Sequence, residues 1–259
     1  MTEFSPNPIS FTQDTKARTP TGLFAFKSLV DRVLNTTIDL LFPPRCAGCG
    51  RIDTVWCRDC QATLSQLTFA NELNVVQPLS GVAAATWHTG VAREAVQALK
   101  YNNAQMIAKP LGERLAACLE HQYWTVDIIV PVPLHMKRLS ERGYNQAKLL
   151  ADQVAAMTGI RCEPEALQRI RETQSQVTVS GTERLTNING AFEAQSSIVN
   201  GQVILMIDDV YTTGSTLSAC GEALIHAGAE RVFGLTVTAA GHPFTHKKET
   251  VDEHHDTRA

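Results

Sequence analysis

The chain has 259 residues, of which 44% are hydrophobic and 19% are charged. That length and apolar share are enough for one full domain with a small extra module. The formal net charge of −3 excludes a nucleic-acid binder that works through overall positive charge, so strong intrinsic nucleic-acid binding is not expected. A phosphate-rich ligand would therefore have to be bound by local groups.

The first residues are polar and include acidic side chains, and no basic start is followed by an apolar run. This excludes a signal peptide of the usual kind. No apolar stretch approaches the ~18 residues that a membrane span needs, so no membrane span is predicted. Scattered single cysteines, of which this chain has three, are ordinary in a reducing compartment. A cytoplasmic protein is expected.

The chain begins with a polar, proline-containing stretch, and residues 1–22 are expected to form a disordered tail. Apolar residues then recur at helical spacing from Leu23 to Leu41, which predicts a helix that Pro43 and Pro44 end. A segment with four cysteines follows immediately. Residues 23–66 are thus expected to form an N-terminal helix joined to a cysteine module.

Strands and helices alternate over residues 80–240. Strands are predicted at 82–87, 126–132, 203–207 and 232–237, and helices at 91–100, 105–120, 147–157 and 217–227. The run 203–207 is apolar at every position, as in a strand buried on both faces of a parallel sheet. The alternation predicts an α/β domain with a mostly parallel sheet flanked by helices. Residues 168–189 are expected to be irregular and 241–259 to form a disordered tail.

The run from Val203 to Leu217 passes from a buried strand, through two carboxylates and a hydroxyl-rich loop, into a helix. Amides at a helix N-terminus favour a dianionic phosphate, and ligands bind at the carboxyl ends of parallel strands. The two carboxylates suit ribose hydroxyls, because they would repel the phosphate. The order predicts a site for 5-phosphoribosyl-1-pyrophosphate (PRPP), or more weakly ribose 5-phosphate, formed by Asp208, Asp209, Thr212, Thr213, Gly214, Ser215 and Thr216.

The same residues also have simpler interpretations. An acidic pair after a strand can be a magnesium site or a solvated loop, and a Thr-Thr-Gly-Ser-Thr run can be a helix N-cap alone. Each piece is weak by itself, and the joined order makes the PRPP interpretation specific. The segment lacks the Gly-Lys-Ser/Thr of nucleoside-triphosphate loops, which excludes that class.

A second polar segment follows the strand predicted at 126–132 and carries three cations, Lys137, Arg138 and Arg142. Cations near a departing pyrophosphate stabilise its charge. Taken by itself, the segment is more typical of a solvated basic turn than of a binding site.

The whole run VPVPLHMKRLSERGYNQAKLLA, residues 130–151, closely resembles the signature of the ComF family, and residues 171–176, 183–187 and 191–192 continue the resemblance. The resemblance implies a type I phosphoribosyltransferase fold, with magnesium accompanying PRPP. It implies catalytic roles for Asp208, Asp209, Arg138 and Arg142. It further implies that Arg138, Arg142, Asn145 and Gln146 lie near the pyrophosphate, and that a flexible loop closing over the site contains Gln176, Arg184 and Asn187. One departure is Asn102-Asn103-Ala104, where the family commonly has an Arg-Gly-Asp-like turn.

The four clustered cysteines form two Cys-x2-Cys pairs separated by seven residues: Cys46, Cys49, Cys57 and Cys60. Two such knuckles place four thiolates around one tetrahedral ion, which predicts a closed, structural zinc site. The alternatives are a redox pair, which would come singly near a βαβ unit, and disulfides, which do not fit the compartment. Members of the ComF family often carry an N-terminal zinc finger of this kind, so the resemblance agrees.

Together these features predict a ComF-like protein that displaces pyrophosphate from PRPP and is linked to DNA uptake and competence. The rival is a non-catalytic PRPP-binding helper or scaffold that acts in DNA uptake through protein partners. The zinc module, a typical adaptor, favours the rival. So does the short segment after the last predicted strand, in which no residue is identifiable as stacking on a base. Either way, a protein partner from the DNA-uptake machinery is expected.

Overall fold

The computed structural model describes residues 43–70, 73–171 and 190–241, and the part from Arg45 onward forms one compact unit. Its centre is a five-stranded, entirely parallel sheet in the order β1-β7-β6-β2-β3. The strands are β1 (Gly81–Trp87), β2 (Ile128–Pro131), β3 (Arg161–Cys162), β6 (Val203–Tyr211) and β7 (Arg231–Ala239). The sequence prediction of an α/β domain with a parallel sheet is confirmed.

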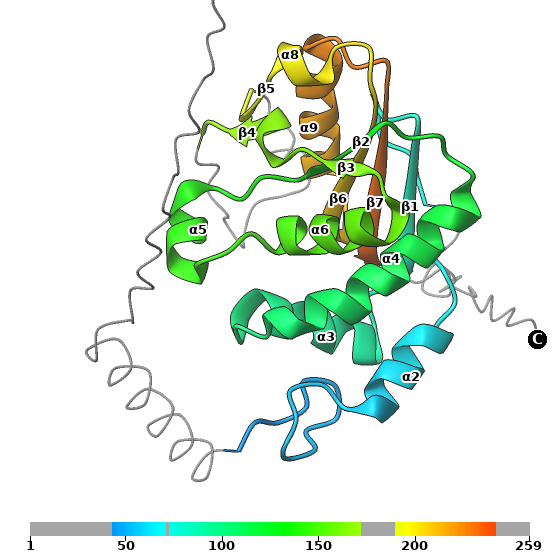
Figure 1. Cartoon of the computed structure of the whole chain (residues 1–259), viewed down its shortest axis with the longest axis vertical. Helices are drawn as coiled ribbons and strands as arrows, with labels where there is room; N and C mark the ends of the chain where they lie inside the picture. The colour runs from blue at the N-terminus through cyan, green and yellow to red at the C-terminus, as the bar shows by residue number, and fades with distance from the viewer. Residues whose placement is uncertain (1–42, 71–72, 172–189, 242–259) are drawn as a thin grey trace, which may run out of the picture. The chain divides into compact units, whose positions relative to one another are not determined.

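Helices cover both faces of this sheet (Figure 1). One face carries α3 (Gly90–Tyr101), α4 (Ala108–Gln122), preceded by a short 3₁₀ turn (Gln105–Ile107), and α6 (Gln146–Thr158). The other face carries α9 (Ser215–His226), with α8 (Ser196–Val199) and a small antiparallel sheet of β4 (Leu167–Arg169) and β5 (Phe192–Ala194). A second 3₁₀ turn, Pro164–Ala166, precedes β4. Because helices cover both faces, the central strands β6 and β7 are apolar on both sides, as their burial shows.

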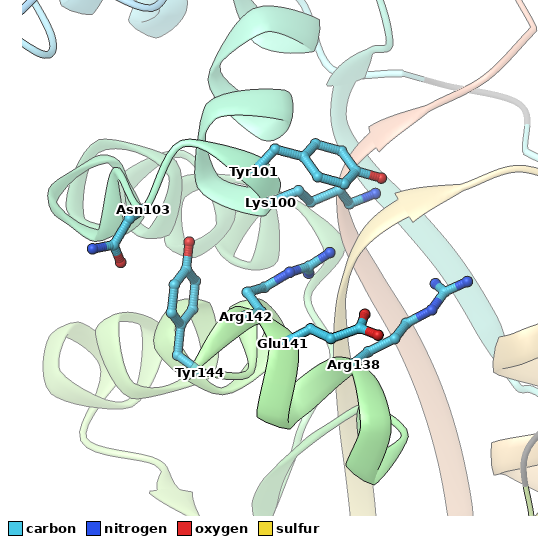
Figure 2. Close-up of a pocket in the computed structure, with 7 residues that line it drawn as sticks. All are labelled: Lys100, Tyr101, Asn103, Arg138, Glu141, Arg142 and Tyr144. Carbon is cyan, nitrogen blue, oxygen red and sulfur yellow. The ribbon is translucent and has the colours of Figure 1, made fainter.

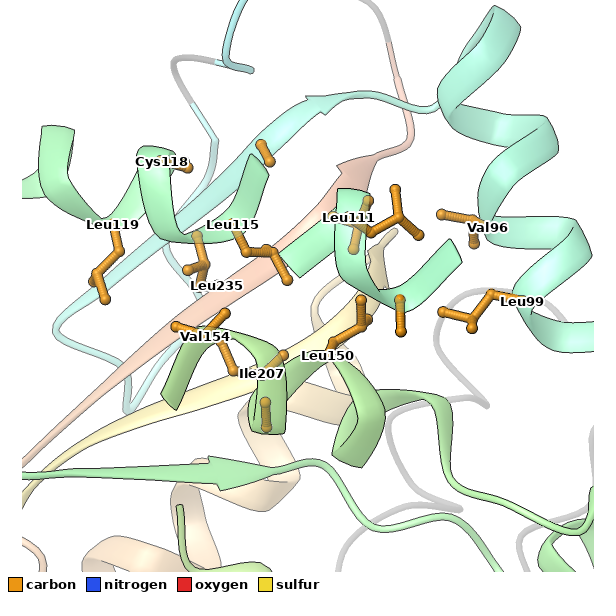
Figure 3. Packing of buried hydrophobic residues seen from close by; sticks show 14 of the residues in the cluster. Val96, Leu99, Leu111, Leu115, Cys118, Leu119, Leu150, Val154, Ile207 and Leu235 are labelled. Atoms are coloured by element: carbon orange, nitrogen blue, oxygen red, sulfur yellow. The ribbon is translucent and has the colours of Figure 1, made fainter. Parts of the chain in front are cut away.

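The larger core lies between the sheet and the three helices on its first face (Figure 3). Leu111 and Leu115 of α4 and Leu150 of α6 are fully buried there against Ile207 and Leu235 of the sheet. Burying a side chain of this size contributes roughly 1.5–3 kcal/mol relative to leaving it exposed. This packing holds the carboxyl ends of β6 and β7 fixed beneath the polar residues that follow them.

The structure differs from the sequence prediction in several elements, and three of them, β3, β5 and α8, have no predicted counterpart. Residues Met136–Arg142, expected to be a basic loop, form the short helix α5, which His135 caps at its start by accepting from the Lys137 amide at 3.3 Å. Strand β6 continues past Ile207 to Tyr211, because its end pairs with β7. Part of the stretch expected to be irregular is strand β4, whereas residues 172–189 lie outside the described residues. The helix expected at 23–41 and both tails lie almost wholly outside them too.

Candidate functional site

A cavity of about 340 Å³ opens at the carboxyl ends of β1, β7, β6 and β2. In open α/β sheets ligands bind at this edge, because loops and helix N-termini converge there. Seven residues singled out from the sequence line the cavity: Asp208, Asp209, Thr212, Thr216, Arg138, Arg142 and Gln146. Residues from two separate segments of the chain, 138–146 and 208–216, are thus brought to one concave site.

The two carboxylates lie inside strand β6 rather than in a loop after it. Neighbouring strand residues point to opposite faces. Asp209 accordingly meets Lys100 of α3 on one face, while the charge of Asp208 acts on Arg169 and Cys220 on the other. Both residues still line the same cavity, since β6 ends at its rim.

Asp209 is buried and forms an ion pair with Lys100, whose Nζ lies 3.0 Å from its Oδ1. Its second oxygen, Oδ2, is also buried, yet it has no hydrogen-bond partner among the described residues. A buried carboxylate oxygen without a partner is costly, so such an atom indicates that a ligand supplies the missing donor. Asp209 itself lines the cavity, so Oδ2 is a candidate acceptor for a donor on a bound ligand.

The pKa of Asp208 is raised to about 7, first by burial and then by the neighbouring charge of Asp209. The Asp209 amide, which donates to Asp208 Oδ1 at 2.8 Å, and the cations Lys100 and Arg169 act in the opposite direction. The free protein therefore carries a protonation equilibrium at the cavity close to neutral pH.

The loop after β6 turns directly into helix α9. Gly214 caps the helix in a left-handed conformation, with φ of 78°, and the hydroxyl groups of Thr213 and Ser215 lie 2.7 Å apart. The loop and the helix N-terminus present backbone amides and hydroxyl groups to one small region, an arrangement that favours an anion. A side chain at Gly214 would meet Val76 and Tyr211 at 2.7–2.8 Å, so packing also requires glycine here.

Basic side chains line the opposite wall. Arg138 and Arg142 of α5 and Lys100 at the end of α3 line both this cavity and an adjoining one of about 470 Å³ (Figure 2). The Arg142 guanidinium lies 5.5 Å from the centre of the exposed Tyr101 ring and donates to Gln146. Several cations around one space favour a polyanion, although the chain as a whole is slightly acidic.

The remaining predicted residues have other surroundings. Thr213, Gly214 and Ser215 belong to the loop but do not line the cavity. Asn145 uses both side-chain groups within the protein, donating to Val132 O and accepting from the Ala147 amide, each at 3.0 Å. The three residues assigned to a flexible loop lie outside the described residues: Gln176, Arg184 and Asn187.

Sequence reasoning missed three lining residues, His88, Lys100 and Arg169. Each lies at the end of an element: β1, α3 and β4. The spacing of a motif within one segment cannot reveal which other segment ends beside it. The usable signal was that His88 directly follows a predicted strand, the position where site residues collect in this architecture.

Comparison with known proteins agrees with this geometry. The family profile described as "Phosphoribosyl transferase domain" matches residues 101–258, more than half of the chain. The chain belongs to the phosphoribosyl transferase domain family. The type I phosphoribosyltransferase fold expected from the sequence is thereby confirmed.

Two relatives of this phosphoribosyl transferase domain protein confirm the resemblance to the ComF family. The Escherichia coli K12 protein named DNA utilization protein YhgH is 29% identical over 194 residues, covering 72% of this chain and 85% of that protein. Competence protein F of Haemophilus influenzae is 28% identical over 205 residues, covering 74% and 84%. Among solved structures, a glutamine PRPP amidotransferase from Bacillus subtilis is 23% identical, with a TM-score of 0.35, over 49% of this chain and 25% of that one.

The four cysteines of the predicted metal module come together in front of the phosphoribosyl transferase domain. Their Sγ atoms all lie within 4.8 Å of one another, and the pairs Cys46–Cys60 and Cys49–Cys57 are each 3.6 Å apart. A tetrahedral zinc ion with four bonds of about 2.3 Å would set these separations near about 3.8 Å. No disulfide joins the four cysteines in the described residues.

Backbone amides support this cluster. The Cys57 amide donates to the Cys46 sulfur at 3.3 Å, and the Cys60 amide donates to the Cys57 sulfur at 3.5 Å. Burial raises the pKa of Cys46, but amide hydrogen bonds from Cys57, Cys49 and Gly48 outweigh it and lower that pKa to about 6. The thiolate, which is the form that ligates metals, is thus favoured at Cys46, whereas burial and then the neighbouring cysteines raise the pKa of Cys60. A side chain at Gly48 would lie 2.7 Å from the Cys60 sulfur, so the knuckle requires glycine.

The cysteine module packs against the phosphoribosyl transferase domain. Val91 of α3 contacts the cysteine cluster. Helix α2 (Arg58–Gln66) is capped by Cys57 and contains Cys60, so the cluster includes its first turn. This helix is held to α4, where Arg114 donates to Ser65 O at 3.3 Å and also to Leu67 O. The described residues contain no helix long and apolar enough to cross a membrane.

Proposed function

We propose that this chain binds PRPP with magnesium in the 340 Å³ cavity and transfers its phosphoribosyl group to an acceptor. The observation that carries the proposal is the buried Asp209, whose Oδ2 has no hydrogen-bond partner among the described residues and which lies in a cavity lined by cations. A ribose hydroxyl would supply the missing donor, and the cations would bind the pyrophosphate.

The ligand would lie across the cavity in three parts. Its 5-phosphate would bind the loop from Thr212 to Thr216, where amides and hydroxyl groups meet. Its ribose hydroxyls would donate to Asp208 and Asp209. Its pyrophosphate would face Arg138 and Arg142. Gln176, Arg184 and Asn187, which the family resemblance assigns to the same site, lie outside the described residues.

The cavity suits magnesium that arrives with PRPP. Mg²⁺ keeps several waters and binds through phosphates and few carboxylates, so it needs no dedicated protein cage. The carboxylates of Asp208 and Asp209 line the cavity and would provide acceptors for those waters. When bound, the ion would neutralise the charge that develops on the pyrophosphate.

The protein residues would act mainly through position and charge. As the bond between C1 and the pyrophosphate oxygen breaks, Arg138 and Arg142 would stabilise the departing anion. The sugar becomes positive at the same moment, and the carboxylates of Asp208 and Asp209 would stabilise it. The carboxylate of Asp209 is buried, so its charge acts with less screening by water than that of the exposed Arg138.

Two relatives are named for DNA utilization and for competence, which supports a role for the proposed activity in those processes. A reducing, cytoplasmic setting suits four free clustered thiols. The defining experiment mixes the purified protein with PRPP, magnesium and a panel of amines and nucleobases, and measures pyrophosphate release. Release that depends on an acceptor supports a transferase. Binding of PRPP without release would instead support the rival, a PRPP-binding helper that acts through a protein partner.

DNA binding by the isolated protein should be weak. The net charge is −3, and the basic residues that line the cavity face a small-molecule site rather than a long track. Any single-stranded DNA affinity should therefore fall steeply with salt. Fluorescence anisotropy with a labelled oligonucleotide at low and physiological salt tests this. Tight binding at physiological salt would show that the chain needs no partner to act on DNA.

We also propose that Cys46, Cys49, Cys57 and Cys60 hold one structural zinc ion. The mutual distances and the amide hydrogen bonds to sulfur support it. The site has four thiolates and leaves no position for a substrate, so the metal would hold the module together rather than take part in the reaction.

Changing Cys49 to Ser should release the zinc and unfold the cysteine module, because three ligands bind zinc far more weakly than four. Metal analysis in reducing buffer should find about one zinc per parent chain. Cys162→Ser is the matched control, since Cys162 is a free cysteine of β3 outside the cluster. Equal zinc content in the parent and in Cys49→Ser would exclude this site, and PRPP affinity should remain largely unchanged in both variants.

A further inference from the structure

His88 lines the PRPP cavity at the end of β1, and none of the roles given above to phosphate, ribose or pyrophosphate uses it. Its ring nitrogen Nδ1 lies 2.8 Å from the hydroxyl oxygen of Thr238 in β7. The ring is half-buried, and its backbone amide is held by Ala239 O at 2.8 Å. His88 is thus a fixed imidazole at the site rather than a mobile surface residue.

The hydroxyl of Thr238 lies between two groups, Nδ1 of His88 at 2.8 Å and the backbone oxygen of Asp209 at 3.4 Å. A threonine hydroxyl has one hydrogen to donate. When that hydrogen goes to the Asp209 oxygen, Nδ1 of His88 donates to Thr238 and Nε2 carries the lone pair, and this is the tautomer that the proposed role uses. No hydrogen bond to Nε2 is made by the described residues.

The surroundings of His88 also keep the ring neutral. Burial lowers its pKa most, and the cations Lys100 and Arg93 lower it further, while Asp209 and Glu94 act in the opposite direction. A neutral imidazole with a free Nε2 lone pair at neutral pH is the form that accepts a proton.

We propose that His88 is the general base of the phosphoribosyl transfer and takes the proton of the acceptor through Nε2. Thr238 is its positioning residue, since it links the ring to the backbone of Asp209, the residue proposed to bind the ribose beside C1. The inference rests on the proposed function, and it limits the acceptor to the class of nucleophiles that carry an N–H or O–H hydrogen.

The step balances without an oxidant or reductant. The acceptor atom forms a bond to C1 of PRPP, and the bond between C1 and the pyrophosphate oxygen breaks with its electron pair leaving on the pyrophosphate. The hydrogen of the acceptor passes to Nε2 of His88, which becomes an imidazolium. Binding of the pyrophosphate near Lys100 reduces the repulsion between that ammonium and the new positive charge.

The test measures pyrophosphate release from PRPP with magnesium at saturating PRPP, with ammonia, adenine and water as acceptors. His88→Gln should lower the rate by about 10²–10⁴-fold, because glutamine keeps the hydrogen bond to Thr238 and cannot take the proton. The rate of the parent should decrease as the pH is lowered and His88 becomes protonated. The rate of His88→Gln should not show this decrease at low pH. Thr238→Val should lower the rate less than His88→Gln does, and it should shift the pH at which the rate decreases. Imidazole in solution should partly restore His88→Ala.

His226→Gln is the matched control, because His226 is an exposed histidine at the end of α9 and does not line the cavity. The His226→Gln variant should release pyrophosphate at the same rate as the parent. Calorimetry with PRPP separates the two proposals. If PRPP does not bind the parent, the proposed function itself is wrong. If PRPP binds both proteins and His88→Gln releases pyrophosphate as fast as the parent, or if the parent releases none with any acceptor, the role of His88 is excluded while PRPP binding stands.

Discussion

Replacing Asp209 with Asn should weaken the binding of PRPP and magnesium by about 10–100-fold, which corresponds to the roughly 1.5–3 kcal/mol of a hydrogen bond to a charged group. The substitution keeps the size of the side chain and removes its charge. Oδ1 of Asp209 faces Lys100 at 3.0 Å, whereas Oδ2 is the unpartnered atom proposed to accept from the ribose. Calorimetry with the parent and the variant measures the change directly.

A matched control separates this effect from a general loss of negative charge. Glu193→Gln makes the same chemical change at an exposed carboxylate of β5, outside the cavity, and should bind PRPP like the parent. Lys100 loses its partner in Asp209→Asn, and its free charge should attract the pyrophosphate and offset part of the loss. Unchanged affinity in Asp209→Asn would show that the ribose does not bind at this carboxylate.

Gly214 illustrates how the structure changes the design of such tests. From the sequence, Gly214→Val is expected to block the phosphate by crowding the anion. The added carbon would instead meet Val76 and Tyr211, and the residue has a left-handed backbone that valine rarely adopts. Loss of PRPP binding in Gly214→Val would then report a disturbed loop as well as a blocked anion. Asp209→Asn is the more specific test of the ligand.

The fold could be predicted because its main signals are local. The apolar run at 203–207 and the helical spacing before Gly159 and Gly228 each depend on neighbours within one segment, and the sheet and helices follow from them. The extent of β6 could not be predicted, because its last residues are strand only through pairing with β7. The helix α5 was missed since its seven residues bury none of their side chains and show no apolar stripe.

The site could be predicted in part, because some of its residues are also close together in the sequence. Asp208, Asp209, Thr212 and Thr216 are neighbours in sequence, so their order was enough to identify them. The partner of Asp209 was not predictable, because Lys100 lies more than a hundred residues earlier and meets it only when α3 packs on the sheet.

The affinity for PRPP should rise as the pH increases from 6 to 8. The pKa of Asp208 is raised to about 7 in the free protein by burial and by Asp209, so the carboxyl group is largely protonated at pH 6. The ribose hydroxyls donate best to the ionised form, and binding would therefore release a proton. For one such group the affinity gain approaches about tenfold per pH unit below the pKa. Calorimetry in buffers of different ionisation enthalpy counts the protons released.

Asp208→Asn separates this titration from that of the ligand phosphates, which is the same for both proteins. The variant should bind PRPP more weakly at pH 8 and lose the additional pH dependence.

The stability of the Asp208→Asn variant should change in the opposite direction to its affinity. A carboxyl pKa raised by folding means that the folded state holds more protons between about pH 4 and 7, so the parent loses stability as the pH rises through that range. Asp208→Asn removes this penalty and should raise Tm by a few degrees at pH 8 while showing little change at pH 4. A variant that is less stable than the parent at pH 8, or that keeps the parent's pH dependence of PRPP binding, would show that Asp208 is not the titrating group. The expected gain in stability together with the loss of affinity follows from one arrangement, two carboxylates placed side by side at the end of a buried strand where only a bound ligand offsets their charge.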